Sequence, residues 1–270
     1  MSATILITGA TDGIGLLTAE RLAADGHHML LHGRNPDKLE VARERVAACG
    51  GGRAVETFLA DLSRIGEVDA LADAVTAAHD RIDVLINNAG IFRTDAPITP
   101  EGVDVRFAVN TIAPCALTRR LLPLFGAGGR IVNLSSAAQA PVDVRAMAGD
   151  IRLEAMEAYA QSKLALTVWS RELAAELGPG GPAVIAVNPG SLLASKMVRE
   201  GFGMAGKDLS IGADILVRAA IGGDFEGASG RYFDNDRGTF AEPHPDALDP
   251  RKSREIMRGL DRIVSRPRAQ

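Results

Sequence analysis

Short apolar stretches alternate with longer amphipathic stretches along most of this chain. Short runs rich in apolar and β-branched residues are typical of strands buried in a parallel sheet. These predicted strands span 3–8, 28–32, 53–59, 84–87, 130–135 and 183–188. Between them, apolar residues recur with helical spacing, which predicts helices. The predicted helices span 14–24, 36–48, 67–79, 102–125 and 153–177.

Strands that alternate with helices of this length predict βαβ units, a mainly parallel sheet and right-handed crossovers. The alternation weakens at 191–209, where glycines predict a long loop of the kind that often forms a lid or binding loop. Beyond it we predict a helix at 214–220, a last edge strand at 231–234, an irregular segment at 243–250 and a terminal helix at 251–264.

No internal repeat and no linker divides the chain. Its 270 residues are enough for one large domain, and α/β folds of this size commonly remain single. We therefore expect one α/β domain over 1–240, with a C-terminal extension, 241–270, packed on the same domain.

The composition is that of an ordinary soluble globular protein, with 46% hydrophobic and 24% charged residues. A net charge of −4 gives no electrostatic footprint for nucleic acid or for an anionic membrane. The first predicted strand begins close to Met1, which leaves no room for a signal segment. No apolar run approaches the roughly 20 residues that span a bilayer. We expect a cytoplasmic protein without nucleic-acid or membrane partners.

The cysteines and histidines point to no metal site. Cys49 and Cys115 lack metal-ligand spacing and fit a reducing compartment. The five histidines form no metal motif, so we expect them to be structural or exposed.

Tyr159 and Lys163 lie four residues apart in the predicted helix 153–177, so both side chains share one face. An unperturbed phenol has a pKa of about 10, and a nearby ammonium can lower it by roughly 1–3 units. Tyr159 could then exchange a proton with an alcohol or ketone. The pair alone also fits an amphipathic surface helix, so its meaning depends on motifs elsewhere.

Gly9, Gly13 and Gly15 lie between the first predicted strand and the first predicted helix. A dinucleotide-binding loop needs glycines there for a tight turn and for close approach of the pyrophosphate, although the spacing is not the commoner G-x-G-x-x-G. About twenty residues later, an acidic residue would bind the ribose 2′-hydroxyl of NAD. Arg34 and Asn35 stand there instead. The Arg34 guanidinium suits a 2′-phosphate, so NADP(H) is favoured over NAD(H).

Further motifs follow in a fixed order. They are Thr8-Gly9-Ala10-Thr11-Asp12-Gly13-Ile14-Gly15, Asp61-Leu62, Asn87-Asn88-Ala89-Gly90, Asn110, Ser135-Ser136, Tyr159-x-x-x-Lys163 and Asn188-Pro189-Gly190. With them the chain resembles the single-domain branch of the short-chain dehydrogenase/reductase family, and in part its retinol-dehydrogenase-like members, from Thr4 to about Asp234. The resemblance implies a Rossmann-type, doubly wound α/β sheet. It also implies an oxidoreductase that interconverts an alcohol and its ketone or aldehyde by hydride transfer.

The resemblance implies a cofactor site assembled from these motifs. Its residues would be Gly9, Thr11, Asp12, Gly13, Ile14, Gly15, Arg34, Asn35, Asp61, Leu62, Asn88, Ala89, Gly90, Tyr159, Lys163, Pro189 and Gly190. Residues 61–62 would border the adenine and 88–90 the adenosine ribose, while 189–190 would lie beside the nicotinamide. Asn87 would brace the central strand.

The resemblance also implies a catalytic set of Asn110, Ser136, Tyr159 and Lys163. Tyr159 would be the acid/base, and Ser136 would hydrogen-bond the substrate oxygen. Lys163 would hold the nicotinamide ribose and lower the pKa of Tyr159, and Asn110 would hold a water in the proton relay. Family members often associate through the helices that here contain Asn110 and Tyr159, which implies a homodimer or homotetramer.

Two departures from the family pattern affect these assignments. Ser136 and Tyr159 are 23 residues apart, farther than is usual, so 139–157 carries an insertion that borders the site. It leaves Ser135 as an alternative, and we choose Ser136 because it matches the second serine of the usual pair. A threonine often follows Gly190 by four positions; Ala194 stands there, and Ser195 is a possible substitute.

The leading hypothesis is an NADP-dependent oxidoreductase acting on a small alcohol or carbonyl compound. The main alternative is a non-catalytic NADP-binding sensor on the same fold, since fold does not fix function. The intact catalytic set argues against a sensor, and the short C-terminal part disfavours a nucleotide-sugar epimerase or dehydratase. The stretches expected near the substrate, 91–99, 139–157 and 191–209, are partly apolar, which predicts a moderately apolar carbonyl substrate.

Overall fold

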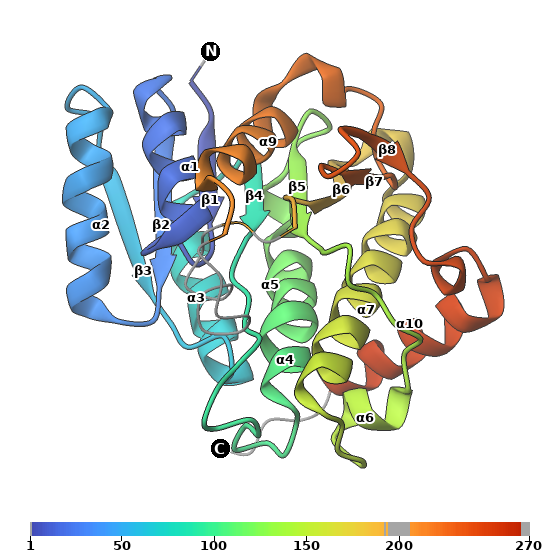
Figure 1. Cartoon of the computed structure of the whole chain (residues 1–270). Helices are drawn as coiled ribbons and strands as arrows, with labels where there is room; N and C mark the ends of the chain where they lie inside the picture. Colours follow the sequence, from blue (N-terminus) through green and yellow to red (C-terminus); the bar gives the residue numbers. More distant parts are fainter. Residues whose placement is uncertain (1, 192, 194–205, 266–270) are drawn as a thin grey trace.

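The computed structural model describes residues 2–191, 193 and 206–265, and a single eight-stranded sheet forms its centre (Figure 1). The strands are β1 Thr4–Ile7, β2 His28–Gly33, β3 Val55–Leu59, β4 Val84–Asn87, β5 Arg130–Leu134, β6 Ala183–Asn188, β7 Tyr232–Asp234 and β8 Thr239–Ala241. Their order is β3-β2-β1-β4-β5-β6-β7-β8. Strands β1 to β7 pair in parallel, and β8 pairs with β7 antiparallel. The predicted doubly wound α/β fold is confirmed.

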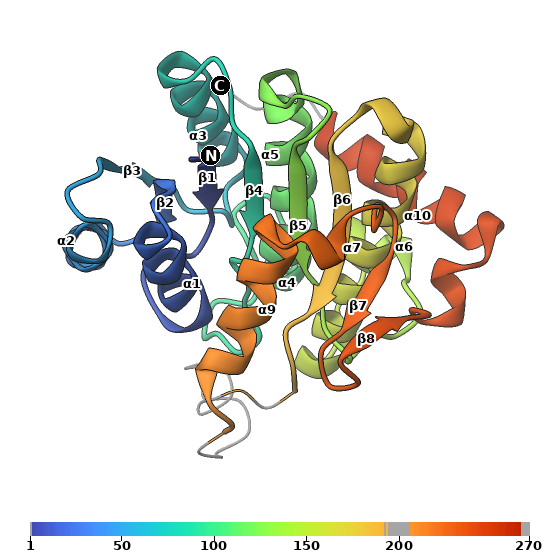
Figure 2. The same ribbon diagram turned by 90° about the horizontal axis from the view of Figure 1, so that it is seen from above.

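Helices cover both faces of the sheet. They are α1 Gly13–Ala24, α2 Pro36–Cys49, α3 Ile65–Ala78, α4 Val105–Phe107, α5 Ala113–Leu121, α6 Val144–Ala148, α7 Ala155–Leu177, α9 Leu209–Ile221 and α10 Pro250–Val264. Side chains of α1, α2 and α9 pack with Ile5 and Ile7 on one face, and those of α3 and α5 pack with Leu6 on the other. Figure 2 shows α1 and α9 on one side of the sheet and α3 and α5 on the opposite side.

The predicted helix 102–125 is interrupted around Asn110, the residue of this helix that we expect in the catalytic set. Asp104 caps α4, and a π-helical turn, Ala108–Ile112, joins α4 to α5. In a regular helix the carbonyl of Asn110 would accept a hydrogen bond from residue 114, but that residue is Pro114 and has no N–H. The wider turn therefore lies where the sequence removes a regular helical bond.

Three more elements differ from expectation. The insertion at 139–157 contains a short helix, α6, and α9 begins at Leu209 rather than at 214 because Asp208 caps it. Strand β7 is not the sheet edge, since β8 pairs with it on the outside. Most of the predicted loop 191–209, including Ala194 and Ser195, lies outside the described residues.

The C-terminal segment packs against the helices that follow β4 and β5. Helix α10 contacts α5, α6 and α7, and its Ile256 and Leu260 join one buried cluster with Trp169 of α7. Strand β8 spans position 240, where we placed the end of the main domain, so that division of the chain stays a prediction. None of the helices in the described ranges has the length and apolarity to cross a bilayer.

Candidate active site

The glycine loop between β1 and α1 has the shape of a phosphate-binding turn. Gly9 and Gly13 have φ of +67° and +57°, a conformation that favours glycine. A Cβ on Gly9 would lie 2.9 Å from Cα of Ala89, whereas nothing lies within 4 Å of a Cβ built on Gly13. Asp12 caps α1 by accepting a hydrogen bond from the N–H of Gly13 at 2.7 Å. The closed side of the turn and the open start of α1 fit a pyrophosphate group.

The end of β4 holds the glycine loop from behind. Asn88 donates through Nδ2 to the carbonyl oxygens of Thr8 at 2.8 Å and Gly9 at 3.0 Å, and the N–H of Ala89 donates to Oγ1 of Thr8 at 3.1 Å. Asn87 links β4 to its neighbour by donating to Oδ1 of Asn133 at 2.8 Å. The expected bracing role of Asn87 is confirmed, while Asn88 supports the loop itself.

His32, which the sequence analysis left as structural, is the second support of the loop. Its Nδ1 accepts a hydrogen bond from the N–H of Gly9 at 3.2 Å, and its Nε2 lies 3.0 Å from the carbonyl oxygen of Ala60. The side chain is buried, and this burial lowers the pKa of His32 to about 4. A neutral imidazole therefore donates to Ala60 and accepts from Gly9, joining two walls of the predicted adenosine site.

The residues predicted to bind the adenosine end of the cofactor differ in their exposure and in their hydrogen bonds. Arg34 is exposed, and across the described ranges it has no ion-pair partner, so its guanidinium is open to an anion. Asn35 caps α2 by accepting from the N–H of Lys38 at 2.9 Å. Asp61 accepts from the N–H of Ser63 at 2.9 Å, and Leu62 is buried.

The Asn188-Pro189-Gly190 motif is fastened by the turn after β7. Asn188 donates through Nδ2 to carboxylate oxygens of Asp234 and Asp236, both at 2.9 Å. The carbonyl of Pro189 accepts from Nδ2 of Asn235 at 2.9 Å, and Gly190 has φ of +121°. This places Pro189 and Gly190 at the carboxyl end of β6, on the same sheet edge as the glycine loop at the end of β1.

Tyr159 and Lys163 lie on α7 beside the end of β5. Nζ of Lys163 donates to the carbonyl oxygen of Leu134 at 2.6 Å and lies 5.8 Å from the centre of the Tyr159 ring. Burial lowers the pKa of Lys163 to about 7 and raises the pKa of Tyr159, the latter opposed by a hydrogen bond from Ser136. Burial therefore dominates the pKa of Tyr159 here, with the amine of Lys163 directed at Leu134, and the expected lowering by Lys163 stays a prediction.

The two serines after β5 have different environments. Oγ of Ser135 is buried, 2.6 Å from Oγ1 of Thr167 and 3.3 Å from the carbonyl oxygen of Lys163. Oγ of Ser136 accepts from the N–H of Ala138 at 3.1 Å and hydrogen-bonds the hydroxyl of Tyr159. Ser136 is therefore the serine that faces Tyr159, and this geometry favours it over Ser135.

Asn110 uses its whole side-chain amide to hold the segment after β4. Its Oδ1 accepts from the N–H of Ile91 at 2.8 Å, and its Nδ2 donates to the carbonyl of Ile91 and to Oγ of Ser162, both at 3.0 Å. Ser162 donates in turn to the carbonyl of Tyr159 at 2.7 Å. A water held by Asn110 would thus bind its backbone carbonyl, which Pro114 leaves without the usual helical partner.

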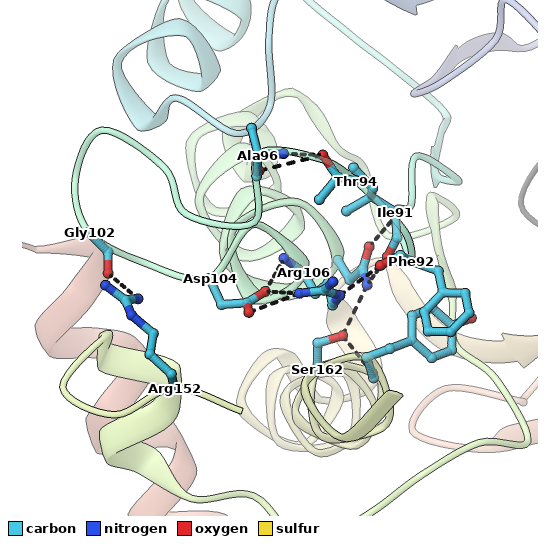
Figure 3. A network of polar contacts seen from close by, with 11 residues as sticks. Ile91, Phe92, Thr94, Ala96, Gly102, Asp104, Arg106, Arg152 and Ser162 are labelled. Carbon is cyan, nitrogen blue, oxygen red and sulfur yellow. Dashed lines mark hydrogen bonds and ion pairs between the residues drawn. The ribbon is translucent and has the colours of Figure 1, made fainter. Parts of the chain in front are cut away.

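A buried ion pair that the sequence analysis missed supports the same segment. Figure 3 shows Arg106 between Asp104 and Phe92. Nε of Arg106 donates to the carbonyl of Phe92 at 2.7 Å, Nη1 lies 3.0 Å from Asp104, and both charged residues are buried. The ring of Phe92 lies 5.2 Å from that of Tyr159. The sequence does contain a signal for this ion pair: two charged residues stand in an otherwise apolar run, and Arg106 lies one helical turn before Asn110.

The insertion at 139–157 is tied to the helices on both sides of it. Arg152 donates to the carbonyl of Gly102 at 3.0 Å, just before α4, and the N–H of Asp143 donates to Oε1 of Gln161 on α7 at 2.9 Å. Its start runs along the site, because the carbonyl of Ala160 accepts from the N–H of Ala140 at 3.3 Å. The insertion therefore borders the helix that carries Tyr159.

The chain is similar to proteins of one family over most of its length. Residues 3–203 match the family model described as short chain dehydrogenase. Retinol dehydrogenase 13 from Mus musculus is 30% identical, with 97% of this chain and 83% of that protein covered. Retinol dehydrogenase 12 from the same species is 34% identical, with 85% and 76% covered.

Solved structures give the same likeness in three dimensions. An uncharacterized protein from Mycobacterium paratuberculosis aligns with a TM-score of 0.77 and 26% identity, covering 97% of this chain and 92% of that chain. A short chain dehydrogenase from Burkholderia cenocepacia, solved in complex with NADP, aligns with a TM-score of 0.68 and 28% identity, covering 86% and 95%.

Proposed function

The chain belongs to the short chain dehydrogenase family of NAD(P)-dependent oxidoreductases, and on that premise we propose that it interconverts an alcohol and its ketone or aldehyde with NADP(H). The observation that carries the proposal is the Tyr159 hydroxyl, hydrogen-bonded to Ser136 and one helical turn from the buried amine of Lys163. A sensor that only binds a nucleotide has no need of an acid, an oxyanion donor and a lysine at one place.

The glycine loop and its surroundings fit a dinucleotide. Gly9, Gly13 and Gly15 would hold the pyrophosphate at the start of α1, and Arg34 would bind the 2′-phosphate. An exposed Arg34 just after β2, with no ion-pair partner among the described residues, and the NADP bound to the Burkholderia relative support NADP(H) as the preferred cofactor. When bound, the nicotinamide supplies or accepts the hydride.

Tyr159 and the groups around it have separate roles in the proposed proton transfer. Its raised pKa keeps the Tyr159 phenol protonated near neutral pH, so it is ready to donate a proton to a carbonyl oxygen during reduction. Ser136 accepts from Ala138 and hydrogen-bonds Tyr159; with a substrate bound, its hydroxyl would turn to donate to the substrate oxygen instead. Lys163, together with a water bound to the backbone carbonyl of Asn110, would return the proton to Tyr159.

The expected homodimer or homotetramer would need a surface other than α5 and α7. Every residue from 160 to 170 on α7 is buried within one chain, and α10 lies against both helices. We propose that the chain is a monomer in solution. Light scattering after size exclusion should give the mass of one chain, 28.4 kDa; a concentration-independent dimer would contradict this.

The substrate we propose is a moderately apolar ketone or aldehyde. The apolar ring of Phe92 beside Tyr159 and the retinol dehydrogenases among the relatives support this class.

A cytoplasmic location stays a prediction, and one relative at 30% identity is a chloroplastic short-chain dehydrogenase from Brassica napus.

The test is NADPH consumption with a panel of carbonyl compounds, from small aliphatic ketones to retinal, using the wild type and Tyr159→Phe. We expect turnover of at least one apolar carbonyl by the wild type and a loss of about 10²–10⁴-fold in the variant. Turnover that survives Tyr159→Phe would contradict the assigned acid. Tight NADPH binding without turnover of any compound would favour the sensor.

A further inference from the structure

The backbone carbonyl of Ser136 is clamped by two side chains from outside the motifs. Nε2 of Gln139 donates to it at 2.9 Å, and the hydroxyl of Tyr232 donates to it at 3.1 Å. Tyr232 lies on β7, 96 residues farther along the chain, and is buried. Ser136, whose hydroxyl hydrogen-bonds Tyr159, is thus held in place through its own peptide group.

The clamp extends into the C-terminal segment. Gln139 hydrogen-bonds the side chain of Tyr232, and its Oε1 accepts from the backbone N–H of His244 at 3.2 Å. His244 follows β8 and precedes the short 3₁₀ turn Pro245–Ala247 that leads to α10. Residues after β8 therefore reach the loop that carries Ser136.

Packing alone does not explain why the side chain at position 232 carries a hydroxyl. The aromatic ring alone would fill its buried position, and a buried hydroxyl without a partner would cost free energy. Burial also raises the pKa of Tyr232 above the ordinary value of a phenol, so the hydroxyl remains a donor across the physiological range. Its backbone acceptor is the carbonyl of Ser136, in the peptide that sets the direction of the Ser136 side chain.

We propose that Tyr232 and Gln139 are positioning residues that hold Ser136 against the hydroxyl of Tyr159, a role that rests on the proposed function for its effect on rate. The loss of one donor loosens the peptide of Ser136, and the loss of both lets it rotate so that its Oγ moves away from Tyr159. Displacements of about 1 Å at a reacting centre can cost about 10²-fold in rate. The hydrogen bond from Ser136 is also what opposes the raised pKa of Tyr159, so its weakening should raise that pKa further.

The chain offers an unusually direct readout, because Tyr159 and Tyr232 are its only tyrosines. With tyrosine labelled with ¹³C at the ring carbon Cζ, an NMR pH titration of Tyr232→Phe reports on Tyr159 alone. Gln139→Leu tests the second donor, and Thr118→Val is the matched control. Thr118 accepts a buried hydrogen bond from Asn87 at 3.1 Å in the core, away from the serine loop.

We expect the Tyr159 titration to move to higher pH in Tyr232→Phe and in Gln139→Leu, but not in Thr118→Val. Where a turned-over carbonyl is known, kcat should fall about threefold to tenfold in each clamp variant while the NADPH dissociation constant stays within about twofold. Because the two donors share one acceptor, the double variant should lose more than the product of the single losses.

The proposal is overturned if both clamp variants leave the Tyr159 titration at its wild-type position, or if they slow turnover no more than Thr118→Val does. Tyr232→Phe keeps the ring, so it stands as a test even where Gln139→Leu is unstable. The titration needs neither substrate nor turnover. A protein that reduces no carbonyl therefore refutes the proposed function and leaves the clamp itself testable.

Discussion

The glycine-loop edge and the surroundings of Tyr159 are built in different ways. At the glycine loop, Arg34 is exposed and Gly13 faces open space, and the supports of the loop, Asn88 and His32, come from neighbouring strand ends. Around Tyr159, the motif residues Asn110 and Lys163 are buried. The supports of this region include the ion pair just before Asn110 and, for Ser136, side chains from β7 and the segment after β8, which lie far along the chain.

The difference shows where each part of the proposed function is vulnerable. A dinucleotide can be bound by backbone atoms and one cationic side chain at the surface. The glycine-loop edge should therefore tolerate substitutions away from the loop. Proton transfer needs several buried groups in fixed positions, so that region depends on contacts that no motif contains. Changes to the supports should therefore affect turnover and stability around Tyr159 more than they affect nucleotide binding.

Arg106→Met should have the largest effect on stability. It leaves the buried carboxylate of Asp104 without its cation, which typically costs about 3–5 kcal/mol. Urea denaturation measures the loss, and the double variant Asp104→Asn with Arg106→Met should recover part of it. Arg43→Met is the control: both Arg43 and its partner Glu40 are exposed, so we expect a change within about 1 kcal/mol. Equal losses in both single variants would remove the contrast between buried and exposed pairs.

Ser136→Ala should lower kcat by about 10²–10³-fold, because it removes a donor to the developing oxyanion, and should leave NADPH affinity unchanged. Ser135→Ala is a matched neighbour whose hydroxyl bonds Thr167. It should cost about 1–3 kcal/mol of stability but leave turnover within severalfold. Steady-state kinetics and denaturation separate the two. The reverse pattern would show that Ser135 faces the substrate.

His32 should make the glycine-loop edge sensitive to acid. Its pKa of about 4 in the folded chain lies below the ordinary value near 6.5, so the folded state favours the neutral ring. The stability that this neutral form supplies is complete above about pH 6.5 and is lost as the pH falls towards 4, by about 3 kcal/mol. Urea denaturation at pH 7 and pH 4 should show a smaller loss in His32→Gln. Identical losses would mean that His32 does not carry the effect.

The sequence was sufficient for the sheet, because parallel strands buried on both faces are apolar throughout, and for the glycine loop, because its function depends on glycine at fixed positions. It missed α6 and β8, which are short and depend on tertiary contacts for their stability.

The candidate site was predictable only in part for the same reason. The spacing of Tyr159 and Lys163 placed them on one helical face, but the pKa of Tyr159 depends on burial, which no spacing reveals. Phe92, Gln139 and Tyr232 meet the site across long stretches of chain, so nothing local in the sequence marks them.

The most direct test of the account is a fluorescence titration of the purified protein with NADPH and with NADH, repeated on Arg34→Ala. We predict that NADPH binds the wild type about tenfold or more tightly than NADH, from charge-assisted hydrogen bonds to the 2′-phosphate, and that Arg34→Ala removes this margin without weakening NADH. Failure of either nucleotide to bind would contradict the glycine-loop assignment and the enzyme built on it. Equal affinities in the wild type would contradict the role of Arg34.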